Sequence, residues 1–204
     1  GVGEYGEGDR FLGVVVPDTR AVARKNTFAS LPEVEGLLES QWHEVRLCGL
    51  LILVGKCRKD VQREVLDFYL AHTSRINNWD LVDLSAPAIV GKYLTNKPQE
   101  RGLLYSLAES TSLWEQRIAM VSTLTLIRNE ELDDTYSMAV KLMNHKHDLM
   151  RKAVGWMLRE AGKRDQRRLE LFLDEYATSM PRTMLRYSIE KFPEPLRRHY
   201  LTMK

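Results

Sequence analysis

An arginine that recurs at the same point of four apolar helical segments constrains the fold of this chain most strongly. The segments share helical spacing of their apolar residues and read HEVRLCGL, WEQRIAMV, DLMRKAVG and TMLRYSIE, with Arg46, Arg117, Arg151 and Arg186. These arginines are 71, 34 and 35 residues apart, so the first gap is about twice each of the others. A unit of about 35 residues is the length of one helix pair in an α-solenoid.

The rest of the chain follows the same helical periodicity. Apolar residues recur at i, i+3, i+4 and i+7 in DVQREVLDFYLAH and LWEQRIAMVSTLTLIR, and no alternating strand run carries a hairpin signal. The GVVVP patch at Gly13–Pro17 is short and ends at proline, which predicts a loop leading into a helix. The Trp, Gly and Tyr pattern of tetratricopeptide repeats is absent. The sequence therefore predicts an all-α fold, an α-solenoid of HEAT-like helical repeats, as a single domain over residues 1–204.

Charge is distributed unevenly along the chain. The net charge is only +2, with 44% hydrophobic and 28% charged residues, as in ordinary globular proteins. Residues Lys141 to Lys204 carry 15 Lys and Arg against 8 Asp and Glu, a net +7, which leaves −5 for the remainder. A basic C-terminal third can attract a polyanion such as nucleic acid, but a solvated basic face explains the same pattern.

The two cysteines, Cys48 and Cys57, do not form a disulfide framework, so a reducing compartment and a cytoplasmic location are expected. The longest apolar stretch, Leu47–Gly55, is too short to cross a bilayer, and no signal peptide is visible. We therefore expect no association with a membrane.

The stretch NNWDLVDLSAP places a tryptophan beside two acids in an otherwise helical pattern. Trp79 and Asp83 are four residues apart and would share one face of a helix. Ser85 and Pro87 predict the cap and first turn of a new helix, which would put Asp83 near a helix N-terminus, where an ionised carboxylate is favoured. In the alternative interpretation, Asp80 or Asp83 only caps a helix and Trp79 fills the core.

Several segments together resemble the AlkD-type DNA alkylation repair family. They are NNWDLVDLSAPAIVGKYL, LWEQRIAMVST, MRKAVGWMLREAGKRD and MPRTMLRYSIEKFPEPLRRHYL, with GEGDRFLGVVVPDTRAVAR near the start, and they extend from Gly6 to Leu201. Members of this family usually have further helical residues before the Gly-Glu-Gly-Asp segment, and we expect this chain to lack some of them.

The resemblance implies HEAT-like repeats and a monofunctional DNA glycosylase that removes cationic N3- and N7-alkylated purines. Asp83 matches the catalytic aspartate of the family, and Trp79 and Trp156 match its two active-site tryptophans. Arg117 matches an arginine that contacts the DNA backbone. An alkylated purine of this kind already carries a positive charge before it leaves the sugar. The reaction therefore needs no general acid, but it does need a carboxylate to stabilise the developing sugar cation and to orient water.

The expected partner is double-stranded DNA with alkylated purines, bound by a monomer without cofactor or metal. Arg117, Arg151 and Arg186, at equivalent repeat positions, are the predicted phosphate contacts. In the alternative, a recurring arginine only packs its stem and pairs with an acid, and for Arg46 and Arg186 the two interpretations are equally supported.

Three other features are weaker candidates for sites. His145, His147 and Asp148 lie in a predicted turn without further ligands nearby, so we interpret them as exposed turn residues. The cysteines are interpreted as buried apolar groups, and GEGDRFLG lacks the strand and helix of a phosphate loop. The rival function is a non-catalytic HEAT-like scaffold that binds nucleic acid or a protein partner.

Overall fold

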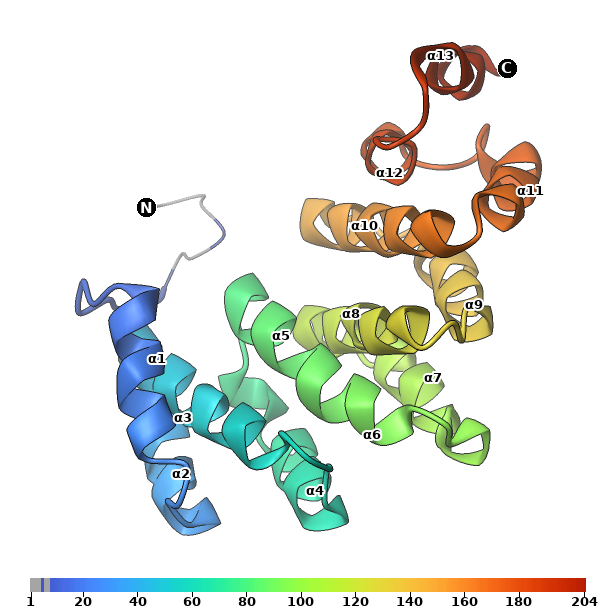
Figure 1. Ribbon diagram of the computed structural model, residues 1–204. Coiled ribbons are helices and arrows are strands. Elements are labelled where there is room, and N and C mark those ends of the chain that lie inside the picture. The colour runs from blue at the N-terminus through green and yellow to red at the C-terminus, as the bar shows by residue number, and fades with distance from the viewer. Residues whose placement is uncertain (1–4, 6–7) are drawn as a thin grey trace. The chain divides into compact units, whose positions relative to one another are not determined.

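The computed structural model describes Tyr5 and residues 8–204, and those residues form helices and connecting turns without a β-strand (Figure 1). The chain divides into two compact units, Gly1–Leu94 and Thr95–Lys204. Gly6 and Glu7, which begin the GEGD segment of the family resemblance, lie outside the described residues. The all-α fold predicted from the helical periodicity is confirmed.

The helices of the Gly1–Leu94 unit are short and follow one another closely. They are α1 (Val16–Lys25), α2 (Leu31–Leu38), α3 (His43–Lys56), α4 (Arg63–Ala71), the 3₁₀ turn η1 (Thr73–Arg75), α5 (Trp79–Ala86), η2 (Pro87–Gly91) and α6 (Lys92–Leu94). Helix α3 packs against α1, α2 and α5, and its Leu50 and Leu53 are fully buried. The predicted loop at Gly13–Pro17 ends where α1 begins, with Pro17 in its first turn.

The Thr95–Lys204 unit also consists of helices joined by short turns. It contains the 3₁₀ turn η3 (Pro98–Glu100), α7 (Gly102–Glu109), α8 (Leu113–Arg128), α9 (Asp133–Leu142), α10 (Asp148–Arg164), α11 (Gln166–Tyr176), α12 (Arg182–Ser188) and α13 (Glu194–Thr202). Helix α10 packs against α8, α9, α11 and α12, and Met150 and Met157 on it are fully buried.

Polar side chains define several helix starts. Ser30 and Glu33 form a capping box before α2, in which the Ser30 side chain accepts from the Glu33 N–H and Glu33 accepts from the Ser30 N–H. Asp165 caps α11 by accepting from the Arg168 N–H at 2.9 Å. Each cap satisfies backbone donors that have no partner within the helix.

Hydrogen bonds between equivalent points of successive helix pairs confirm the repeat of about 35 residues. Lys92 donates to the carbonyl of Cys57, 35 residues earlier, and Arg168 donates to Asp133 across the same separation. Lys141 donates to Glu109 across 32 residues. The spacing of the arginines in the sequence therefore reports a real unit of packing.

The helix that begins at Trp79 does not stop at Ser85, and the predicted cap there is wrong. Helix α5 continues through a π turn, η2, into α6, and the Lys92 N–H reaches back to the Pro87 carbonyl. Proline lacks an N–H and crowds the preceding α-helical turn, and the wider π turn accommodates it. The Ser85 hydroxyl instead donates to the Leu81 carbonyl at 2.5 Å. Asp83 consequently lies inside a continuous helix rather than near a new N-terminus.

Candidate active site and nucleic-acid contacts

Trp79 and Asp83 lie on one face of α5, as their spacing predicted. Trp79 is the first residue of the helix and is 44% exposed, so it does not fill the core. Asp83 is half-buried one turn further on. The N-cap is Asn78, whose side-chain oxygen accepts from the Trp79 N–H at 2.7 Å, so neither Asp80 nor Asp83 caps this helix. This face of α5 therefore carries an accessible indole one turn from a half-buried carboxylate.

A buried phenol lies near Asp83. The Tyr69 hydroxyl on α4 is 2.8 Å from the Ser85 hydroxyl of α5. Burial raises the pKa of Tyr69 above its ordinary value, the Ser85 hydrogen bond opposes this rise, and the charge of Asp83 adds to it. The phenol therefore stays protonated, and it ties α4 to the turn that carries Asp83.

Asp80 belongs to a partly buried network of polar and charged side chains at the start of α5. His43 Nε2 lies 2.7 Å from Asp80 Oδ2, and His43 Nδ1 lies 3.2 Å from Asp9 Oδ2. Asp9 also accepts from Arg46 Nη2 and from Asn78 Nδ2, both at 2.6 Å. We call these five residues the Asp9 network. It joins the segment before α1 to the N-termini of α3 and α5, so it fixes the turn that presents Trp79.

The ionisation of the Asp9 network follows from its contacts. Burial acts to lower the pKa of His43, but the hydrogen bond to Asp80 and the charges of Asp80 and Asp9 outweigh it, and the pKa is raised. Burial acts to raise the pKa of Asp9, but hydrogen bonds from Asn78 and Arg46 lower it below its ordinary value. The two carboxylates thus favour the protonated form of His43 over the neutral form, relative to an isolated histidine.

The loop before α1 is held by Glu44 of α3. Its carboxylate accepts from the backbone N–H groups of Leu12 and Gly13, both at 2.9 Å, and Gly13 has a φ of 83° that suits glycine. The Phe11 ring lies 4.9 Å from the His43 ring. Phe11 and Leu12 are nevertheless about half exposed, at 54% and 50%. The loop is therefore anchored through its backbone and leaves apolar side chains at the surface.

The remaining predicted site residues belong to the Thr95–Lys204 unit. Trp156 is half-buried on α10. Arg117 on α8 is only 4% exposed, and its Nη1 donates to the Leu149 carbonyl at 2.6 Å. That bond holds the N-terminus of α10 against α8, so Arg117 has a clear packing role. Its predicted contact with a DNA phosphate stays a prediction.

The recurring arginines differ in exposure although their repeat positions are equivalent. Arg46 is 3% exposed and donates to the Ser40 and Gln41 carbonyls as well as to Asp9, so for this arginine the packing interpretation holds. Arg151 is half-buried and its Nε donates to the His145 carbonyl at 3.0 Å. Arg186 is exposed. Arg186 is thus the most accessible of the set, and its contact with DNA stays a prediction.

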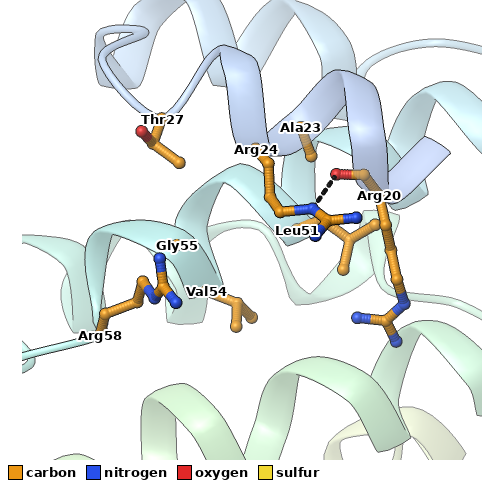
Figure 2. Close-up of a pocket in the computed structure, with 8 residues that line it drawn as sticks. All are labelled: Arg20, Ala23, Arg24, Thr27, Leu51, Val54, Gly55 and Arg58. Carbon is orange, nitrogen blue, oxygen red and sulfur yellow. Dashed lines mark hydrogen bonds between the residues drawn. The ribbon is translucent and has the colours of Figure 1, made fainter. Parts of the chain in front are cut away.

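A cationic cavity in the Gly1–Leu94 unit was not anticipated from the sequence. It measures about 600 Å³ and is lined by Arg20, Ala23, Arg24, Thr27, Leu51, Val54, Gly55 and Arg58 (Figure 2). The i, i+4 spacing of Arg20 and Arg24 on one helix was a readable signal. Arg58 follows α3, and only the packing of α1 on α3 brings it to the same cavity.

The weaker candidates are not organised as sites. His145 donates through Nε2 to Gln116 Oε1, 2.9 Å away, and its Nδ1 accepts from the His147 N–H. His147 caps α10, because its ring nitrogen accepts from the Leu149 N–H. In the part of the chain that the structure describes, no group of three or more His, Cys, Asp or Glu side chains could hold a metal ion. Burial raises the pKa of Cys57 to about 11, which keeps its thiol protonated and a poor nucleophile. Among the described residues, no helix combines the length and apolar character needed to span a bilayer.

Comparison with known proteins shows a family for this chain and a solved structure to which it is similar. The family model described as "DNA alkylation repair enzyme" matches residues 2–192. A solved structure titled "Predicted DNA alkylation repair enzyme from Enterococcus faecalis" is similar with a TM-score of 0.78 and 17% sequence identity, over 92% of this chain and 90% of that chain. At that identity the likeness shows the fold. No curated protein matches the chain.

Proposed function

Because the chain belongs to the DNA alkylation repair enzyme family, we propose that it is a monofunctional DNA glycosylase. Its substrates are N3- and N7-alkylated purines in duplex DNA, and its product is the free base. The family supports the general role in the repair of alkylation damage. The finer assignment, to hydrolysis of the N-glycosidic bond, is supported by the side chains on α5.

Removal of a cationic base requires mainly electrostatic stabilisation from the protein. An N3- or N7-alkylated purine is cationic and leaves as a neutral base, so its departure needs no proton donor. The sugar becomes cationic as the bond breaks, and an ionised Asp83 stabilises that charge and accepts a hydrogen bond from the attacking water. The exposed face of Trp79 stabilises the same charge through a cation–π interaction.

The observation that carries this proposal is the pairing of Asp83 with an exposed Trp79 on α5. A tryptophan at the first position of a helix, 44% exposed, is poorly explained as a core residue. The π turn that follows Asp83 widens the helix, and such turns are frequent at functional sites. Hydrogen bonds from the Asp9 network and from the Tyr69 hydroxyl hold α5 in place. Asp83 and Trp79 are therefore presented on a rigid element.

The proposal also includes four residues of the Thr95–Lys204 unit: Trp156, Arg117, Arg151 and Arg186. Their assignment depends on the family resemblance of the segments that contain them and, for the arginines, on their equivalent repeat positions. Phosphate contacts would position DNA without reading its sequence. We expect the protein to act as a monomer in the cytoplasm.

Base release from methylated duplex DNA tests the function. Under single-turnover conditions, Asp83→Asn should slow release by about 100-fold or more, since loss of one charge-stabilising group in an active site has effects of that size. Asp67→Asn is the matched control, because Asp67 is an exposed acid on α4 that pairs with Arg63. Circular dichroism and thermal unfolding verify that both variants are folded.

Two outcomes would overturn the assignment. Release at the wild-type rate by folded Asp83→Asn would remove Asp83 from the chemistry. Duplex binding without any base release by the wild-type protein would favour the non-catalytic scaffold, with Trp79 as a surface residue of the binding face.

A further inference from the structure

We propose that the cavity between α1 and α3, lined by Arg20, Arg24 and Arg58, holds a phosphodiester of the DNA backbone. This contact is separate from the side chains assigned to base release, and it extends the proposed function to a second point of contact with DNA. Its first support is charge. All eight lining residues are arginine or uncharged, so three arginines and no carboxylate line the cavity.

The three arginines have no ion pair within the described part of the chain. Arg24 donates through Nε to the Arg20 carbonyl at 3.4 Å, a long bond within its own helix, which Figure 2 shows as a dashed line. Arginines elsewhere in the same unit are paired, Arg46 with Asp9 and Arg63 with Asp67. Like charges that gather without a counter-ion repel one another, and an anion in the cavity would relieve that repulsion.

Helix capping does not account for these arginines. Basic residues near helix C-termini often complement the helix dipole and its last carbonyl groups. At the end of α3, however, Lys92 already donates to the Cys57 and Arg58 carbonyls, at 2.6 and 2.7 Å. At the end of α1, Asn26 donates through its side chain to the Val22 carbonyl at 2.8 Å. The guanidinium groups therefore remain available to a ligand.

The cavity has a formed apolar floor. Ala23 and Leu51 are 2% and 8% exposed and close its base between α1 and α3. The wall at Thr27 is tightly placed, since a Cβ on Gly55 would lie 2.7 Å from the Thr27 methyl group. Lys56 donates to the Thr27 carbonyl at 3.1 Å and holds that turn against α3.

This combination fits a sugar-phosphate unit of a nucleic-acid strand. Guanidinium N–H groups form paired hydrogen bonds with phosphate oxygens, and they do so with geometric specificity. The apolar floor suits the C–H face of a deoxyribose. A volume of about 600 Å³ lies within the range of ligand sites and can take one nucleotide of a strand.

Salt dependence of binding to undamaged duplex DNA tests the site. The variants are Arg20→Gln, Arg24→Gln, Arg58→Gln and the triple replacement, and Arg63→Gln is the control. Arg63 lies on α4 of the same unit and pairs with Asp67, so its replacement removes the same charge without touching the cavity. Each arginine that contacts a phosphate should contribute about 0.9 to the slope of log K against log salt. We expect the triple variant to lose about two or more units of slope and Arg63→Gln to keep the wild-type slope.

Several results would overturn the site. A wild-type slope in the folded triple variant would exclude phosphate contacts there. A loss in Arg63→Gln equal to the loss in a single cavity variant would reduce the effect to net charge. Deoxyribose 5-phosphate is the second probe: if it binds wild type but not the triple variant, while the duplex slope is unchanged, the cavity takes a free phosphate instead of DNA.

The test is independent of catalysis because it uses undamaged DNA. If the cavity does not contact phosphate, base release and its dependence on Asp83 are unaffected. If the protein releases no base but the triple variant still changes the salt slope, the cavity is part of a DNA-binding scaffold.

Discussion

Two groups of basic side chains in the Gly1–Leu94 unit are in opposite situations. In the Asp9 network, Arg46 and His43 are buried and contact carboxylates at 2.6 to 3.2 Å. In the cavity between α1 and α3, the three arginines meet no acid among the lining residues. Paired buried charges hold the segment before α1 against α3 and α5, whereas the unpaired charges contribute little to that packing. The contrast separates residues that build the molecule from residues free to bind a ligand.

The largest effect expected from this contrast is on stability. Arg46→Met should lower the free energy of unfolding by about 3–5 kcal/mol, because it leaves the Asp9 carboxylate buried without its guanidinium partner. Arg20→Met, at an exposed position of the cavity, should change it by about 0.5 kcal/mol or less. Urea unfolding of both variants measures the difference. Similar losses in the two would show that the cavity arginines also support the fold.

Arg117 extends the comparison to the other unit. Arg117→Met should lower the free energy of unfolding by about 1–3 kcal/mol, since the Leu149 carbonyl loses a buried donor. Arg186→Met is the control at an equivalent repeat position and should be nearly neutral, because Arg186 is exposed. If Arg117→Met instead keeps full stability but lowers the salt slope of DNA binding by about one, the phosphate role outweighs the packing role.

The charge state of His43 makes the Asp9 network sensitive to pH. The pKa of His43 is raised in the folded protein, so its contribution to stability is complete below the unfolded value of 6.5 and is lost as pH rises through the folded pKa. The pKa values of Asp9 and Glu44 are lowered, so their contribution is lost as pH falls below about 4.

Melting temperatures measured between pH 5.5 and 8.5 should therefore decline toward the alkaline end. This decline should be smaller than the drop in melting temperature that Arg46→Met causes. His43→Gln should flatten this decline. Replacement of the exposed His199 by Gln is the control and should leave the decline in place. A decline that persists unchanged in His43→Gln would assign the pH dependence to other groups.

Trp79 should contribute little to the stability of the fold. Trp79→Ala should lower stability by about 1 kcal/mol or less, below the 3–5 kcal/mol typical of a buried aromatic, because the side chain is 44% exposed. Base release should slow by about 30-fold if the indole face stabilises the sugar cation by about 2 kcal/mol. Trp156→Ala, at a half-buried position, should cost more stability. Full activity per folded molecule in both variants would make the indoles packing residues.

The periodicity of apolar residues and the spacing of the arginines were enough to predict helices and their repeat. Helix formation is largely local, and amphipathic faces of about 35-residue units must pack against their neighbours. The same locality placed Trp79 and Asp83 on one face of α5, because four residues span about one turn.

Local signals also misled at Ser85 and Pro87. In isolation this pair predicts a new helix, but the packing of α5 and η2 against α3 keeps the chain helical through a π turn. Burial supplied by neighbouring helices outweighed the local cost of a proline within a helix. Asp83 therefore keeps its face on α5 but loses the helix N-terminus that the sequence suggested.

The sequence by itself determined the helices, their repeat and the face of α5 that carries Trp79 and Asp83. The tertiary structure decided which charges are paired. Asp9, His43 and Asp80 lie 34 or more residues apart along the chain. They meet only because α5 and the segment before α1 both contact α3. Arg20 and Arg58 likewise line one cavity because α1 packs against α3. Pairing of charges depends on distance and burial in the folded chain, and a linear sequence contains neither.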